Sequence, residues 1–149
     1  GRRHRYVASG RIKVLGDELP ERLGYIFKEI SSIIEQWQPH TMGVEQVFVN
    51  KNVDSALKLG QARGAAICAG VQANLGIGEY TPRAIKKAVV GSGSAEKEQI
   101  QQMMKILLKL DFLPQNDEAD GLAIAICHAN HMHVESIGIA NKVRGGRWR

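Results

Sequence analysis

The sequence has 149 residues, of which 44% are hydrophobic and 23% are charged. This composition is typical of one compact globular domain rather than a disordered chain. The formal net charge is +5 and the pI is about 9.4, which favours a polyanionic partner. No apolar run approaches the ~20 residues needed to cross a bilayer, and the basic start lacks the apolar core of a secretory signal. We therefore expect a cytoplasmic domain whose charge suits nucleic acid.

The first part of the chain predicts strands and one amphipathic helix. Residues 5–14 alternate loosely between polar and apolar side chains, so one or two strands are expected there. Residues 23–37 repeat apolar side chains at helical spacing and end before Pro39, which predicts a helix packed on a sheet. Residues 41–49 are rich in valine and predict a largely buried strand.

A carboxylate, Glu45, interrupts this apolar strand. Acidic residues are uncommon in strands and are seldom buried without a partner. Two interpretations stay open: Glu45 lies at an exposed edge of a half-solvated strand, or it contributes to a site for a divalent metal ion.

The helix expected over residues 54–74 contains many small residues. Gly60 and Gly64 stand four apart and would let another backbone approach closely. Such packing would compensate for the cost of glycine inside a helix, about 1 kcal/mol each. The partner is either the sheet of the same chain or a second copy across a two-fold axis.

A glycine–serine turn over residues 91–97 follows a predicted strand at 78–81 and a predicted helix at 82–89. It leads into another amphipathic helix, for which Ser94 is the expected N-cap. Free amides at that helix start would suit a phosphate group.

Basic residues surround this turn in the sequence. They predict either a surface that binds the backbone phosphates of a nucleic acid or an ordinary solvated basic face. The cluster consists of Arg83, Lys86, Lys87 and Lys97.

Asp117 and Asp120 open an alanine-rich apolar run with the composition of a buried helix. Positions i and i+3 share a helix face, so the two carboxylates project in the same direction and repel each other. Oxygen ligands of this kind favour Mg²⁺ or Mn²⁺, although acidic residues are also common at the positive end of a helix dipole. With Glu45, the pair would supply the carboxylates for two-metal phosphodiester chemistry, in which the ions lie about 3.5–4 Å apart.

The cysteines and the late histidines predict structural roles. Cys68 and Cys127 lie singly in apolar helical stretches, so both are expected to be small buried hydrophobes. His128, His131 and His133 lack an acidic or cysteine partner for a metal ion. Histidine is in any case favoured near a helix C-terminus by the helix dipole.

Four segments stand in order along the chain: VEQVF at 44–48, NVDSALKLGQARG at 52–64, VVGSGSAEK at 89–97 and DEAD at 117–120. Together they resemble the bacterial RuvC family of Holliday-junction resolvases. The resemblance runs in order and with matching spacing to about His131. It implies an α/β ribonuclease H-like nuclease domain over residues 1–136, with a mixed β-sheet flanked by helices. The polar and basic composition from residue 137 onward separately predicts a flexible tail over residues 137–149.

The resemblance also implies an activity and its residues. Family members act as homodimers that nick four-way junctions symmetrically in homologous recombination and DNA repair, with Mg²⁺ or Mn²⁺, two ions being expected per active site. RuvA and RuvB are the implied partners. Lys97 would also stabilise charge in the transition state, and Arg83 joins the DNA contacts as a member of the basic cluster. The implied positions are Glu45, Asp117 and Asp120 for the metal, Phe48 facing the junction, and Lys86 and Lys97 on DNA phosphates.

One family feature has no counterpart in this sequence: a first strand with an aspartate in a Gly-Ile-Asp-Pro-Gly motif. In ribonuclease H-like sheets that strand is central and its aspartate binds metal, so this chain alone is expected to be poorly stable and inactive. Two other functions stay open, a non-catalytic basic nucleic-acid-binding module and a structural dimerisation domain. Convergence of Glu45, Asp117 and Asp120 in one basic-rimmed cleft would favour the enzyme.

Overall fold

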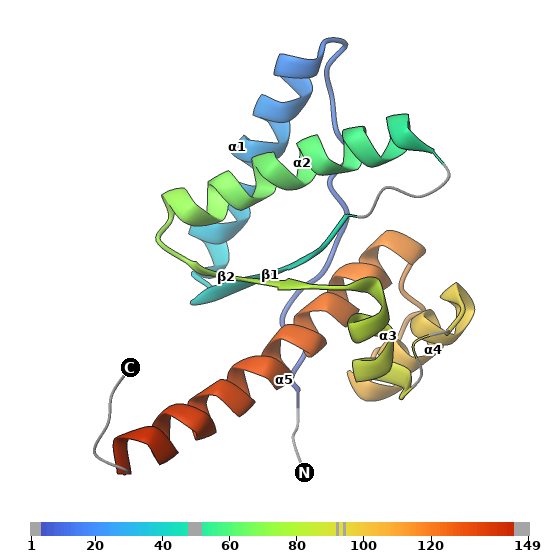
Figure 1. Cartoon of the computed structure of the whole chain (residues 1–149). Coiled ribbons are helices and arrows are strands. Elements are labelled where there is room, and N and C mark those ends of the chain that lie inside the picture. The colour runs from blue at the N-terminus through green and yellow to red at the C-terminus, as the bar shows by residue number, and fades with distance from the viewer. Residues whose placement is uncertain (1–3, 48–51, 92, 94, 145–149) are drawn as a thin grey trace. The chain divides into compact units, whose positions relative to one another are not determined.

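The computed structural model describes residues 4–47, 52–91, 93 and 95–144, and it describes side chains as far as residue 133. The chain divides into two compact units. We call Val7–Pro82 the strand unit, and we call Gly1–Tyr6 together with Arg83–Arg149 the helical unit. The elements are α1 (Leu19–Trp37), β1 (Thr41–Glu45), α2 (Val53–Gln72), β2 (Gly76–Tyr80), α3 (Pro82–Val90), α4 (Lys97–Leu107) and α5 (Asn116–Arg144) (Figure 1).

The sheet of the strand unit is a parallel pair, β1 with β2. Its register joins Thr41 to Gly76 and Glu45 to Tyr80. Both strands were predicted, although β1 ends four residues before the predicted end at 49. The mixed sheet is wrong for the described residues, because a mixed sheet needs antiparallel pairing and this pair is parallel.

Helix α2 covers one face of this sheet, as the first interpretation of its small residues predicted. A Cβ at Gly70 would lie 2.7 Å from Met42 Sδ and 2.8 Å from Ile77 Cδ1. These distances are too short for a real Cβ, so Gly70 lets the helix backbone approach the sheet closely. The Asn52 side chain begins the helix by accepting a hydrogen bond from the Ser55 amide at 3.1 Å, as an N-cap does.

Helix α1 was correctly predicted but packs differently from the prediction. It lies against α2 (Figure 1), and none of its residues is fully buried. Ile33 and Trp37 remain 42% and 48% exposed. Helix α1 therefore packs mainly on α2, while α2 packs on the sheet.

The predicted strands over residues 5–14 are wrong. Among residues 4–16, which the structure describes, the backbone forms no strand. A strand is defined by hydrogen bonds to a neighbour, and the described sheet consists of β1 and β2 alone. Alternation of side chains by itself does not supply such a neighbour.

The helical unit is built around the packing of α4 on α5. Met104, Pro114 and Cys127 are fully buried at its centre. Helix α4 begins after Glu96, whose amide donates to Gln99 Oε1 at 2.8 Å. The N-cap is thus Glu96 rather than the predicted Ser94, which lies outside the described residues.

Helix α5 runs through Arg144, past the predicted start of the flexible tail at residue 137. That segment is therefore helical up to residue 144, and residues 145–149 lie outside the described chain. The division into a domain and a tail stays a prediction. Cys127 is buried as predicted, but Cys68 is exposed on α2. None of the described helices is long and apolar enough to cross a membrane.

Candidate functional site

Asp117 and Asp120 lie in the first turns of α5, as the sequence predicted. The helix start is fixed by the Ala119 amide, which donates to the Gln115 carbonyl at 2.8 Å. Ala119 and Ala123 are each 1% exposed, whereas both aspartates are exposed. Helix α5 therefore buries its alanine face and presents the two carboxylates at the surface.

The charges around Asp120 come from three helices of the helical unit. Although Asp120 is partly exposed, desolvation by its surroundings raises its pKa above the ordinary value of 3.8, and the negative charge of Asp117 raises that pKa further. Lys97 and Lys86 act in the opposite direction. The fold thus brings α3, α4 and the start of α5 together around one carboxylate pair.

This carboxylate pair fits a hard divalent cation. A cation between the aspartates would relieve the repulsion that raises the pKa of Asp120, and carboxylate oxygens are ligands that Mg²⁺ and Mn²⁺ prefer. Among the described residues, neither unit by itself gathers three or more His, Cys, Asp or Glu side chains suited to a metal. Within its described residues, the helical unit therefore offers two carboxylates to a divalent cation, and their role as metal ligands stays a prediction.

Glu45 is the last residue of β1 and is exposed, whereas its neighbour Val44 is buried. This exposure agrees with the first interpretation of Glu45, an exposed position at the edge of a half-solvated strand. Side chains alternate along a strand, and Met42 lies on the face that α2 covers, so Glu45 projects from the opposite face. Glu45 belongs to the strand unit and the aspartates to the helical unit. Their convergence stays a prediction.

The sequence did not single out Arg63, which contacts the ends of both strands. Its Nε donates to the main-chain carbonyl of Glu45 at 2.9 Å, and its guanidinium forms an ion pair with Glu79 of β2. Arg63 lies within the family-like segment at residues 52–64, but only the fold shows what it touches.

The glycine–serine turn packs against the basic cluster. A Cβ at Gly93 would lie 2.5 Å from Arg83 Cγ, so glycine lets the turn approach the stem of that arginine. Arg83 and Lys97 are exposed and Lys86 is half-buried. Lys97 is the first residue of α4, where helix amides and the dipole also favour an anion.

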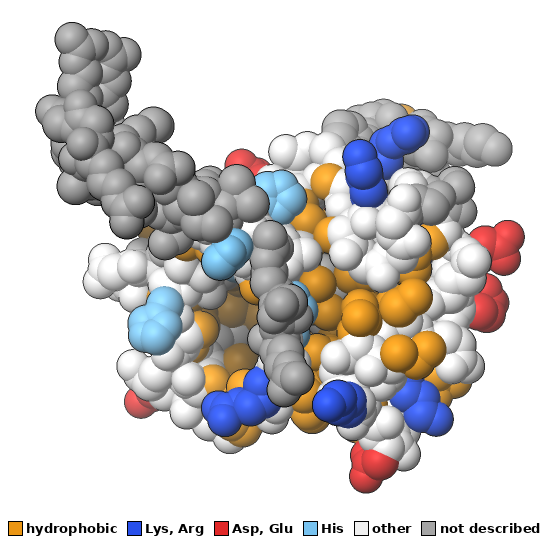
Figure 2. All heavy atoms as spheres, turned by 90° about the horizontal axis from the view of Figure 1, so that it is seen from below, with side chains coloured by type: hydrophobic (Ala, Val, Ile, Leu, Met, Phe, Trp, Pro, Cys, Tyr) orange, Lys and Arg blue, Asp and Glu red, His pale blue; other side chains and the backbone are white. Residues whose placement is uncertain are grey.

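Exposed hydrophobic side chains are also present in the helical unit. Figure 2 shows hydrophobic side chains at the surface of one face, interspersed with Lys and Arg. Ile106, Leu107, Phe112 and Leu113 are among the exposed ones.

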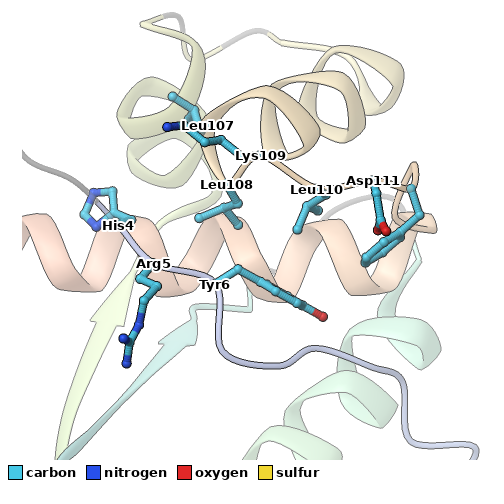
Figure 3. Close-up of a pocket in the computed structure, with 9 residues that line it drawn as sticks. His4, Arg5, Tyr6, Leu107, Leu108, Lys109, Leu110 and Asp111 are labelled. Carbon is cyan, nitrogen blue, oxygen red and sulfur yellow. The ribbon is translucent and has the colours of Figure 1, made fainter.

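A separate hollow of about 700 Å³ lies beside the end of α4. It is lined by residues 4–6 and 107–112, with the Tyr6 and Phe112 rings edge to face at 6.3 Å. Figure 3 shows Leu108 and Leu110 pointing toward the chain segment with Tyr6, while Arg5 points away. None of the predicted site residues that the structure describes lines this hollow. Phe48 lies outside the described residues, so its role stays a prediction.

The histidines have structural surroundings. His128 is 7% exposed, and His131 Nδ1 lies 2.9 Å from the Cys127 carbonyl, to which a protonated Nδ1 would donate. Cys127 Sγ lies 3.8 Å from the Ala84 carbonyl, and burial raises the pKa of its thiol. Cys127 thus has the buried structural role predicted for it. The three histidines lie inside α5, which runs to Arg144, so the helix C-terminus predicted near them is wrong.

A parallel strand pair covered by a helix, followed by helices that present carboxylates beside lysines, defines an α/β protein of the ribonuclease H-like class. The family model for crossover junction endodeoxyribonuclease RuvC matches residues 1–128. The chain belongs to the RuvC family, which consists of metal-dependent nucleases.

Relatives and solved structures agree with this assignment. The crossover junction endodeoxyribonuclease RuvC of Psychromonas ingrahamii is 56% identical over 146 residues, covering 97% of this chain and 84% of the relative. That of Stutzerimonas stutzeri is 53% identical over 151 residues, covering 100% and 87%. The Thermus thermophilus RuvC structure superposes with a TM-score of 0.78 at 29% identity, covering 89% and 81%. The structure of the T. thermophilus protein in complex with a Holliday junction substrate gives 0.74 at 31% identity, covering 80% and 73%.

Proposed function

We propose that the protein is a structure-specific endonuclease that resolves four-way DNA junctions by metal-dependent phosphodiester hydrolysis during homologous recombination and DNA repair. The observation that carries the proposal is the carboxylate pair of α5, which lies within electrostatic reach of Lys86 and Lys97. Metal-binding carboxylates next to phosphate-binding lysines are what hydrolysis of a polyanionic backbone requires. Family membership supports the same activity.

In this proposal Glu45, Asp117 and Asp120 hold the metal, Mg²⁺ or Mn²⁺, with two ions per active site. Bound divalent ions would supply an activated water and stabilise the leaving oxygen. The chain itself fixes the two aspartates on one helix face, and Lys97 is placed to stabilise negative charge that develops on the phosphate.

The test is cleavage of a synthetic four-way junction by the full-length protein, with a linear duplex of the same arm sequence as the control. We expect paired nicks in the junction in Mg²⁺, no cleavage in EDTA and little cleavage of the duplex. Tight junction binding without cleavage in any divalent ion would favour the non-catalytic binding module.

We propose that Arg83, Lys86 and Lys97 contact DNA phosphates and that Phe48 faces the opened junction. The lysines are exposed or half-buried, and both lower the pKa of Asp120, so they lie near the carboxylates. Phosphates held by these cations would be close to the proposed metal ligands. An aromatic at position 48 could stack on an unpaired base, which is worth about 1–3 kcal/mol.

Replacing Lys86 or Lys97 by alanine should weaken binding to all junction sequences to a similar extent. Because each variant removes one phosphate-binding cation, the slope of log affinity against log salt should fall by about one unit. Lys105→Ala is the matched control, because Lys105 lies in the last turn of the same helix that Lys97 begins. Salt slopes that stay unchanged in both variants would assign Lys86 and Lys97 to the solvated surface.

We also propose that the protein is a homodimer that pairs through the exposed face of α2. Gly60 and Gly64 are exposed, and no described atom lies within 4 Å of a Cβ placed at either. Val53, Leu57 and Val71 are 55–58% exposed and fall on the same side of the helix by its 3.6-residue period. Packing within the described chain thus accounts for Gly70 but not for Gly60 and Gly64, which a second copy would cover.

We infer that the protein works in the cytoplasm with the branch-migration proteins RuvA and RuvB. The family resemblance supports these partners. Co-purification of the protein with RuvA or RuvB on a four-way junction, and not on duplex DNA, would test them.

A further inference from the structure

Arg63 ties α2 to the ends of both strands. Its Nε donates to the Glu45 carbonyl at the end of β1, while its guanidinium pairs with the Glu79 carboxylate near the end of β2. The register aligns Glu79 with Val44, the neighbour of Glu45. One side chain therefore fixes the place where the two strands end.

The geometry of these contacts separates the arginine from the Glu45 carboxylate. Val44 and Glu79 are register partners and follow Met42 and Ile77 at a spacing of two residues, so Glu79 lies on the face that α2 covers. Glu45 projects from the opposite face. Arg63 thus binds Glu45 through its main chain, from the side away from the carboxylate.

The Arg63 side chain is 24% exposed and that of Glu79 is 52% exposed. An ion pair this exposed contributes little stability by itself. Its geometric effect is larger, because a planar guanidinium with two partners holds both in a fixed relation.

We propose that Arg63 is a positioning residue for Glu45, holding the end of β1 so that the carboxylate is presented in a fixed orientation to a divalent cation. This inference rests on the proposed role of Glu45 as a metal ligand. Residues that orient a ligand in this way typically change metal affinity about 10–100-fold when they are replaced.

The sign of the effect distinguishes positioning from simple electrostatics. Arg63→Gln removes a positive charge near the proposed cation site, so charge alone would make Mn²⁺ bind more tightly. Loss of positioning would make Mn²⁺ bind more weakly. Weaker binding therefore cannot come from the charge change.

The experiment measures Mn²⁺ affinity of the full-length protein by electron paramagnetic resonance of free Mn²⁺, without DNA. We expect Arg63→Gln to weaken binding about tenfold. Lys58→Gln is the matched control: it removes the same charge from an exposed position of the same helix and should not weaken binding. In junction cleavage, Arg63→Gln should raise the Mg²⁺ concentration for half-maximal rate, while junction affinity in EDTA stays unchanged.

Arg63→Lys keeps the charge but loses the planar fork, so its Mn²⁺ affinity should lie between wild type and Arg63→Gln. If Arg63→Gln fails to fold, Arg63→Lys replaces it in the Mn²⁺ affinity measurement. Wild-type affinity in Arg63→Gln, or in Arg63→Lys where Arg63→Gln does not fold, together with weak binding by Glu45→Gln, would overturn the inference and leave the proposed function standing. Unchanged Mn²⁺ affinity in Glu45→Gln would reject the proposed role of Glu45, and the inference with it.

Discussion

Replacing Asp117 or Asp120 by asparagine is expected to reduce junction nicking by at least about a hundredfold, because a catalytic metal supplies several kcal/mol of transition-state stabilisation and each 1.36 kcal/mol is worth a factor of ten. Junction binding in EDTA should change little, since the lysines hold the phosphates. Cleavage of a labelled four-way junction in Mg²⁺, and binding of the same junction in EDTA, measure the two effects. Nicking at the wild-type rate would refute the assignment.

Thermal unfolding without metal provides the control for misfolding. The folded-state pKa of Asp120 is raised above 3.8, so folding disfavours the ionised form. This destabilisation is fully present above the raised pKa and is relieved as the pH falls below it. At neutral pH in EDTA, Asp120→Asn should therefore unfold at a temperature equal to or above that of the wild type. A clear drop in melting temperature would attribute the lower activity to the fold.

Leu57→Asp is expected to dissociate the proposed homodimer. Burial of a leucine side chain contributes about 1.5 kcal/mol or more in each copy. A symmetric interface loses this contribution twice, so the dimer dissociation constant should rise at least about a hundredfold. Sedimentation equilibrium over a range of protein concentrations measures the shift from dimer to monomer.

Leu59→Asp is the matched control for this prediction. Leu59 is 61% exposed and Leu57 is 58% exposed. A step of two positions turns the helix by about 200°, so the two side chains project in nearly opposite directions. The two variants carry the same change at similar exposure on nearly opposite sides of α2. Dissociation by both, or by Leu59→Asp alone, would place the interface elsewhere.

The sequence by itself determined the features that depend on neighbouring residues. The helices α1 to α5, the strand with Glu45 and the carboxylates at the start of α5 follow from periodicity and from the shared face of positions i and i+3. The motif at residues 117–120 also led to the family, because its order and spacing with the other segments are visible without a structure.

Tertiary structure decided the features that depend on residues far apart in the chain. The approach of Lys86 and Lys97 to Asp120 requires three helices to pack together, and the contact between Arg63 and Glu45 spans 18 residues. Strand formation in residues 5–14 and burial of Cys68 were predicted from local patterns and are wrong. A strand needs a hydrogen-bonded neighbour and burial needs a covering element, and a local pattern determines neither.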